Sequence, residues 1–249
     1  MTAEYFDSWF ADIDRSEARQ QLFTDCLGVP PEVGPSNLVP LVGLHQISDA
    51  LKLPPGATLI DLACGRGGPG MWLARKAGVR LIGVDFSAEA IRQATLRRAL
   101  FGLESSAAFQ LGTLQASGLP EGVADAIVCV DAFQFATDGV AAATEVRRLL
   151  RPGRHVVLTS WEPVDRDDEA ISERIRAVDL GGWLSAAGFI EVVSEERPEW
   201  HETARQMWTK VVAMDVAEDP ALISTRDEGE RSLTNHDRLR RVIATATAP

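Results

Sequence analysis

The feature that most constrains the fold is a glycine-rich loop between a short apolar run and a helix. The run covers residues 57–62, and Gly65, Gly67 and Gly70 follow it at the spacing G-x-G-x-x-G. Such a loop brings backbone close to a ligand and turns the chain sharply into a helix N-terminus. The sequence therefore predicts a strand, a ligand-binding turn and a helix at 69–77.

Further apolar runs of strand type alternate with helical segments. Strands are expected at 79–85, 107–111, 124–130, 154–161, 189–194 and 240–248, with helices at 87–102, 139–150 and 180–187. Ser87 and Gly102 suit the two ends of the first of these helices. The alternation predicts an α/β protein with a largely parallel sheet covered on both faces.

Composition limits the partners and the compartment. The net charge is −11, and the arginines are interleaved with acidic residues, so we expect no nucleic acid partner. No run reaches the roughly 20 apolar residues that span a bilayer, and no membrane partner is expected. Three cysteines far apart, Cys26, Cys64 and Cys129, fit no disulfide framework, which together with an acidic N-terminus favours the cytoplasm.

Two acidic residues flank the glycine loop and bear on the choice of nucleotide. Asp85 ends the second strand 20 positions after Gly65, where it suits the hydroxyls of a ribose. Asp61 ends the first strand, where its charge favours a cationic ligand such as S-adenosylmethionine over a pyrophosphate. A dinucleotide reductase is disfavoured, because Tyr5 is the one tyrosine and no Y-x-x-x-K pattern exists.

At these residues the chain resembles the class I S-adenosylmethionine-dependent methyltransferases, in their small-molecule, quinone-biosynthesis-like branch. The matching segments are DLACGRG (61–67), VDFS (84–87), GLP (118–120), LLRPGRHVVLTSWE (149–162) and WLSAAGFIEVV (183–193). The resemblance implies a Rossmann-like, seven-stranded sheet whose last strand is antiparallel. It also implies S-adenosylmethionine as cofactor and S-adenosylhomocysteine as product. The expected acceptor is a small, largely apolar metabolite that is methylated at O, N or C.

The resemblance also implies a layout and a set of cofactor contacts. We expect one domain with an N-terminal helical cap (1–52), a core (53–198 and 238–249) and a helical lid (199–237). Three residues depart from the family pattern: Ala63 replaces a glycine, Thr113 an aspartate and Gln134 a histidine. The expected cofactor-binding residues are Asp61, Ala63, Cys64, Gly65, Gly67, Asp85, Phe86, Thr113, Leu114, Val130 and Gln134.

Candidate catalytic residues are fewer than candidate cofactor contacts, because methyl transfer needs at most one proton removed from the acceptor. Asp131 follows the fourth strand at the sheet edge where α/β proteins bind ligands. His45 and His201 are candidate general bases, and Trp161 and Trp208 are candidate walls of an apolar acceptor pocket. No metal site is expected, and the chain is a monomer or homodimer. The alternative is a module that binds or senses the cofactor without catalysis.

Overall fold

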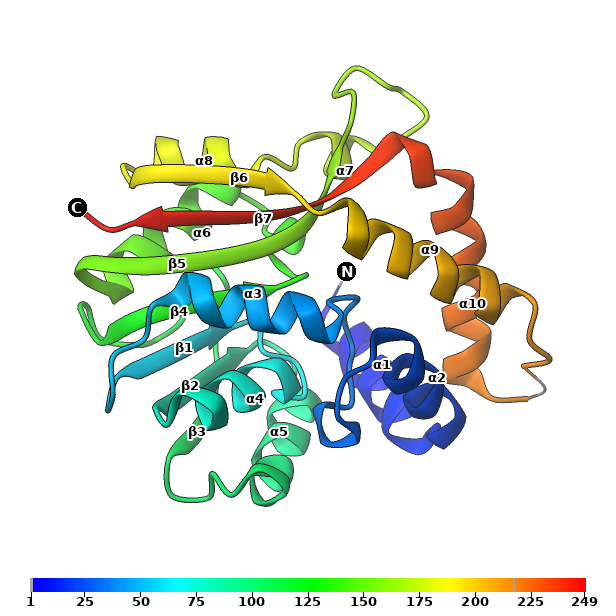
Figure 1. Cartoon of the computed structure of the whole chain (residues 1–249), viewed down its shortest axis with the longest axis horizontal. Helices are drawn as coiled ribbons and strands as arrows, with labels where there is room; N and C mark the ends of the chain where they lie inside the picture. The colour runs from blue at the N-terminus through cyan, green and yellow to red at the C-terminus, as the bar shows by residue number, and fades with distance from the viewer. Residues whose placement is uncertain (1, 217) are drawn as a thin grey trace.

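The computed structural model describes residues 2–216 and 218–249, and a seven-stranded sheet lies at its centre (Figure 1). The strand order is β3-β2-β1-β4-β5-β7-β6. Strands β1 to β5 pair in parallel, and β7 runs antiparallel to β5 and β6. The strands are β1 (Thr58–Leu62), β2 (Arg80–Asp85), β3 (Ala107–Leu111), β4 (Ala124–Val130), β5 (Leu150–Pro163), β6 (Ile190–Glu196) and β7 (Leu239–Thr247). The predicted fold class and its antiparallel last strand are confirmed.

Helices cover both faces of this sheet. In Figure 1, α3, α4 and α5 lie in front of the strands, and α6 and α8 lie behind them. Each layer closes a hydrophobic core of its own, one lined by α3, α4 and α9 and the other by α6 and α8. The helices are α1 (Ala3–Arg15), α2 (Glu17–Leu27), α3 (Leu41–Leu51), α4 (Gly68–Ala77), α5 (Ala88–Phe101), α6 (Gly139–Leu149), α7 (Glu173–Arg176), α8 (Leu180–Ala186), α9 (Pro198–Val212) and α10 (Pro220–Thr234), with 3-10 turns η1 (Pro31–Val33), η2 (Phe133–Phe135) and η3 (His236–Arg238).

Four helices gather beyond the carboxyl ends of the parallel strands. Figure 1 shows α1, α2, α9 and α10 together on the right, the end toward which β1 to β5 run. The helices contact one another, since α2 packs on α9, α9 on α10 and α1 on α10. These helices come from the two ends of the chain, so segments about 200 residues apart meet over the same sheet edge.

The segment before η3 and β7 is helical. Trp200, Ala204, Met207, Trp208 and Val211 recur at helical spacing and form the buried face of α9. One strand is longer than expected, because β5 begins at Leu150 and ends at Pro163. Its carboxyl half continues past Trp161, because β7 pairs with it residue by residue from His155 to Pro163.

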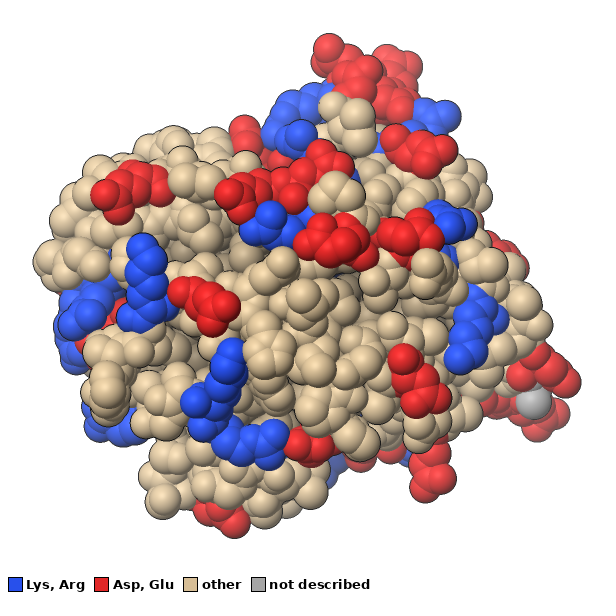
Figure 2. Space-filling view, viewed as in Figure 1, with Lys and Arg blue, Asp and Glu red and all other residues tan. Residues whose placement is uncertain are grey.

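Charged side chains are unevenly spread on the surface. On the face in Figure 2, Asp and Glu prevail along the upper and right-hand rims, with some Lys and Arg among them, and further Lys and Arg groups lie at the left and lower left. Among the described residues, no helix has the length and apolar character needed to cross a membrane.

Candidate cofactor and acceptor site

Two buried carboxylates lie side by side at the carboxyl ends of β1 and β2. Asp61 pairs in register with Gly83, so Asp61 and Asp85 end neighbouring strands. Both side chains are almost fully buried. Burial, reinforced by the charge of Asp85, raises the pKa of Asp61 to about 8, and burial also raises the pKa of Asp85. A buried carboxylate that is costly to ionise is a site that favours a cationic partner.

The glycine loop is held in place by Asp85. The backbone N–H of Gly65 donates to Asp85 Oδ2 at 2.8 Å, and the N–H of Ser87 donates to Oδ1 at 2.9 Å. Asp85 therefore orders the loop, and its carboxylate retains acceptor capacity for a ligand hydroxyl. Gly65 and Gly67 have φ of 52° and 77°, in the region that favours glycine.

Ala63 shares that left-handed conformation, with φ of 54°. An alanine is strained there by roughly 1 kcal/mol, which explains why a glycine suits this position in the family pattern. The loop closes through the N–H of Gly67, which donates to the carbonyl of Cys64 at 2.9 Å. Cys64 is buried, and burial raises the pKa of its thiol well above the ordinary value, so it packs as a neutral group.

Close packing continues into α4. A Cβ on Gly70 would overlap the Asp61 carboxylate, and a Cβ on Gly68 would overlap the carbonyl of Val33. The absence of side chains here lets the helix begin directly against the acid. The site thus offers a carboxylate suited to a cation, a second carboxylate suited to a diol and a glycine loop whose backbone carries no side chains at Gly65 and Gly67. Together these groups fit the adenosyl cofactor that the resemblance implies.

Helix α1 covers this loop. The ring of Phe6 lies 5.3 Å from Phe86 and 5.7 Å from Phe135, both edge-on. Phe10 lies against Gly65, 3.2 Å from where a Cβ would stand. Asp7 accepts hydrogen bonds from the Ser87 hydroxyl and the Glu89 N–H, which fix α1 to the start of α5. Sequence reasoning expected a helical cap but did not single out these residues, although Phe6 and Phe10 lie one turn apart on α1.

The remaining predicted cofactor contacts lie around the same sheet edge. The hydroxyl of Thr113 accepts the N–H of Ala116 and so stabilises its own turn, and Leu114 is buried beside it. Val130 ends β4 and is buried. Gln134 donates to the carbonyl of Asp131 at 2.8 Å and accepts from Ser160 at 2.9 Å.

Asp131 forms a buried ion pair that sequence reasoning missed. Nη2 of Arg241 lies 2.9 Å from its carboxylate, and Arg241 is fully buried. The Leu38 N–H and the Thr159 hydroxyl also donate to the carboxylate, at 3.0 and 2.8 Å. Asp131 therefore carries its charge beside a fixed cation. The alternation of side chains along the last strand could have indicated that Arg241 is buried, because it puts Arg241 on the same face of β7 as the buried Ile243.

The two predicted histidines occupy different places. His201, on α9, lies 5.4 Å from the Trp161 ring and stacks at 3.7 Å on His236. Burial, with the neighbouring His236, lowers the pKa of His201, which keeps it neutral at pH 7. His45 is exposed on α3, where Nδ1 lies 2.8 Å from Lys76 Nζ. The structure thus brings His201 near Arg241 and places His45 against α4.

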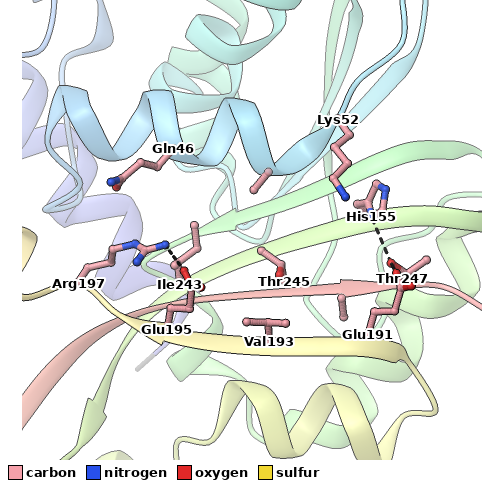
Figure 3. Close-up of a pocket in the computed structure, with 12 residues that line it drawn as sticks. Gln46, Lys52, His155, Glu191, Val193, Glu195, Arg197, Ile243, Thr245 and Thr247 are labelled. Atoms are coloured by element: carbon pink, nitrogen blue, oxygen red, sulfur yellow. Dashed lines mark hydrogen bonds and ion pairs between the residues drawn. The ribbon is translucent and has the colours of Figure 1, made fainter.

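A groove of about 360 Å³ lies elsewhere, between α3 and the strands β5, β7 and β6 (Figure 3). Figure 3 shows Lys52 and His155 at one end of it and Arg197 beside Glu195 at the other. The described residues that line it do not include Asp61, Asp85 or Asp131. It is therefore separate from the carboxyl edge of the sheet.

Comparisons with known proteins agree with this geometry. Residues 59–153 match the family model of a methyltransferase domain. Phosphoethanolamine N-methyltransferase 3 of Arabidopsis thaliana is 31% identical over 163 residues, which are 62% of this chain and 33% of the relative. The 2-methyl-6-phytyl-1,4-hydroquinone methyltransferase of Synechocystis is 31% identical over 119 residues, which are 48% of this chain and 36% of the relative. The chain thus spans about a third of the length of these relatives.

A solved structure shares the fold. Phosphoethanolamine N-methyltransferase 2 of Haemonchus contortus in complex with S-adenosyl-L-methionine superposes with a TM-score of 0.75 at 15% identity, covering 97% of this chain and 60% of that one. The family match runs from β1 through β4 to the first residues of β5, and this segment contains the glycine loop and both buried carboxylates.

Proposed function

Because this chain belongs to the class I S-adenosylmethionine-dependent methyltransferases, we propose that it transfers a methyl group from S-adenosylmethionine to O, N or C of a small metabolite. The observation that carries the proposal is the pair of buried carboxylates, Asp61 and Asp85, on either side of the glycine loop. Asp61 faces a cationic group and Asp85 a ribose diol, which matches the two polar ends of this cofactor.

The chain's own residues supply binding and alignment. The cofactor, when bound, supplies an activated methyl group on a positively charged sulfur. Asp85 holds the loop through Gly65 and presents its free lone pairs to the sugar. Phe86 is partly exposed and offers its ring to the adenine. Phe6 and Phe10 close over the loop from α1 and exclude water, which an in-line displacement requires.

The acceptor site lies where β4, β5, β7 and α9 meet. Trp161 and Trp200 give this region apolar walls, and His201 stands beside Trp161. His201 Nε2 is buried and has no hydrogen-bond partner among the described residues. As a neutral imidazole it accepts the proton that an acceptor hydroxyl or amine loses as its new bond to the methyl carbon forms.

Three free cysteines support a reducing compartment such as the cytoplasm.

The test is incubation of the protein with methyl-labelled S-adenosylmethionine and a library of small acceptors. We expect a labelled product and an equal amount of S-adenosylhomocysteine, with the His201→Gln variant slower by about 10²-fold or more. Binding of the cofactor with no product in any pool would favour the non-catalytic module that Ala63, Thr113 and Gln134 suggest. Absence of cofactor binding would overturn the proposal.

A further inference from the structure

Arg241 holds a buried positive charge with unused donors. The residue is fully buried on β7, and one of its three guanidinium nitrogens, Nη2, binds Asp131. Nε and Nη1 are also buried, and neither has a hydrogen-bond partner within residues 2–216 and 218–249. Leaving a buried charged donor unpaired is costly, so these two positions favour an oxygen acceptor supplied from outside the chain.

The surroundings of the guanidinium are aromatic. Its central carbon lies 4.8 Å from the Trp161 ring centre and 5.8 Å from that of Trp200. Trp161 is directly opposite Arg241 in the β5–β7 ladder, and Trp200 reaches it from α9. Arg241 also contributes to the lowered pKa of His201, which places that imidazole nearby. A ligand here meets a cation, two indole rings and a neutral histidine.

This cluster lies next to the glycine loop. Ser36 Oγ is 3.4 Å from the position of a Cβ on Gly65, and the Leu38 N–H binds Asp131. Two residues of chain span at most about 7 Å, so the segment from Ser36 to Leu38 links the loop to the Asp131–Arg241 pair over a short distance. A molecule bound at Arg241 is therefore within a small-molecule length of the cofactor site.

We propose that Arg241 binds an oxyanion of the methyl acceptor, a carboxylate or a phosphate, while Trp161 and Trp200 hold its apolar body. The acceptor is thus an amphipathic anion and not a wholly apolar molecule. The inference rests on the proposed function, since it names the substrate class of that same site. Arg241 is a binding residue in this account, and Asp131 positions it.

The test measures binding of matched probes to the protein saturated with S-adenosylhomocysteine, by ligand-observed NMR titration. The probes are phenylacetate, phenyl phosphate and the neutral phenylacetamide. We expect one or both anions to bind about tenfold or more tightly than the amide, as charge-assisted hydrogen bonds require. The two anions distinguish a carboxylate from a phosphate as the natural group. Equal binding of all three probes, or binding of none, would overturn the inference.

Variants test whether the preference for anionic probes depends on the Arg241 side chain. Arg241→Lys keeps a cation beside Asp131 but removes the Nε and Nη1 donors, so the preference for the anion is expected to fall about tenfold. Arg240→Lys is the matched control, because Arg240 lies on the opposite face of β7 and pairs with Glu162. If Arg241→Lys fails to fold, the double variant Asp131→Asn/Arg241→Gln removes both charges and is expected to lose the preference. An unchanged preference in a folded variant would contradict the assignment.

S-adenosylhomocysteine affinity, measured separately by calorimetry, keeps the two proposals distinguishable. If S-adenosylhomocysteine does not bind to the wild-type protein, the proposed function is contradicted. Normal cofactor binding without a preference for anions would count against the role of Arg241 alone.

Discussion

If Asp61 binds the cofactor as we propose, it couples cofactor binding to pH. Its pKa of about 8 exceeds the ordinary 3.8, so between these values the folded protein holds a proton that the unfolded chain has lost. Stability of the ligand-free protein therefore falls as pH rises through this window. A cationic ligand stabilises the ionised carboxylate, so binding below pH 8 must release that proton.

This linkage gives the first prediction. At pH 7, binding of S-adenosylhomocysteine is expected to release about one proton, measured by calorimetry in two buffers of different ionisation enthalpy. Affinity is expected to rise from pH 6 to pH 8. In Asp61→Asn both effects should disappear, because the amide does not titrate. The same proton release in wild type and variant would show that another group is responsible.

Gly70 gives a second prediction at the scale of one residue. Alanine normally stabilises a helix relative to glycine, but here its Cβ would overlap the Asp61 carboxylate. Gly70→Ala is therefore expected to lower the free energy of unfolding by about 1–3 kcal/mol and to weaken S-adenosylhomocysteine binding. Urea unfolding and calorimetry measure the two effects. Gly181→Ala is the control, since a Cβ there stands 3.4 Å from Ser194, an ordinary contact; equal behaviour of both variants would refute the clash.

Among the elements, α1 has the clearest functional consequence. Its Phe6 ring contacts Phe86 and Phe135, and such aromatic pairs contribute roughly 0.5–1.5 kcal/mol each beyond the area they bury. Phe6→Ala is expected to speed dissociation of S-adenosylhomocysteine about tenfold in stopped-flow displacement. Leu96→Ala, on the exposed side of α5, should leave the rate unchanged. A dissociation rate that Phe6→Ala does not alter would show that α1 does not cover the bound cofactor.

The core strands and helices could be predicted from the sequence because their signals are local. β1 and β4 are buried along their whole length and so appear as largely apolar runs. The capping roles of Ser87 and Gly102 are also local and are confirmed. The pairing of Asp131 with Arg241, 110 positions apart, could not be predicted, because it depends on where β7 inserts beside β5. The contact of Phe6 with Phe86 depends likewise on docking of α1.

For the whole molecule, the layout of core, cap and lid stays a prediction with a direct thermal test. Helices from both chain ends pack on one another over the site, so we expect one cooperative unfolding transition. A ligand at about 100 times its Kd adds about 2.7 kcal/mol. For a chain of this size S-adenosylhomocysteine should then raise Tm by about 5–10 °C. Two transitions, of which the ligand shifts one, would indicate that cap or lid unfolds separately.

The negative charge of the whole molecule bears on how an anionic acceptor reaches the site. The chain has a net charge of −11, and acidic side chains prevail along two rims of the face in Figure 2. The negative potential of this surface repels the anionic acceptor that we propose as it approaches. The buried guanidinium of Arg241 attracts the anion once it has entered the site.

The central claim is that Asp61 binds the cationic end of the cofactor while Asp85 binds its sugar. The most direct test compares S-adenosylmethionine with 5′-methylthioadenosine, which shares the sugar and base but lacks the cationic amino acid portion, by calorimetry on Asp61→Asn and Asp85→Asn. We predict that Asp61→Asn weakens S-adenosylmethionine by about ten- to hundredfold and barely affects 5′-methylthioadenosine, whereas Asp85→Asn weakens both alike. Equal effects of Asp61→Asn on the two ligands, or no effect of either variant, would contradict the account.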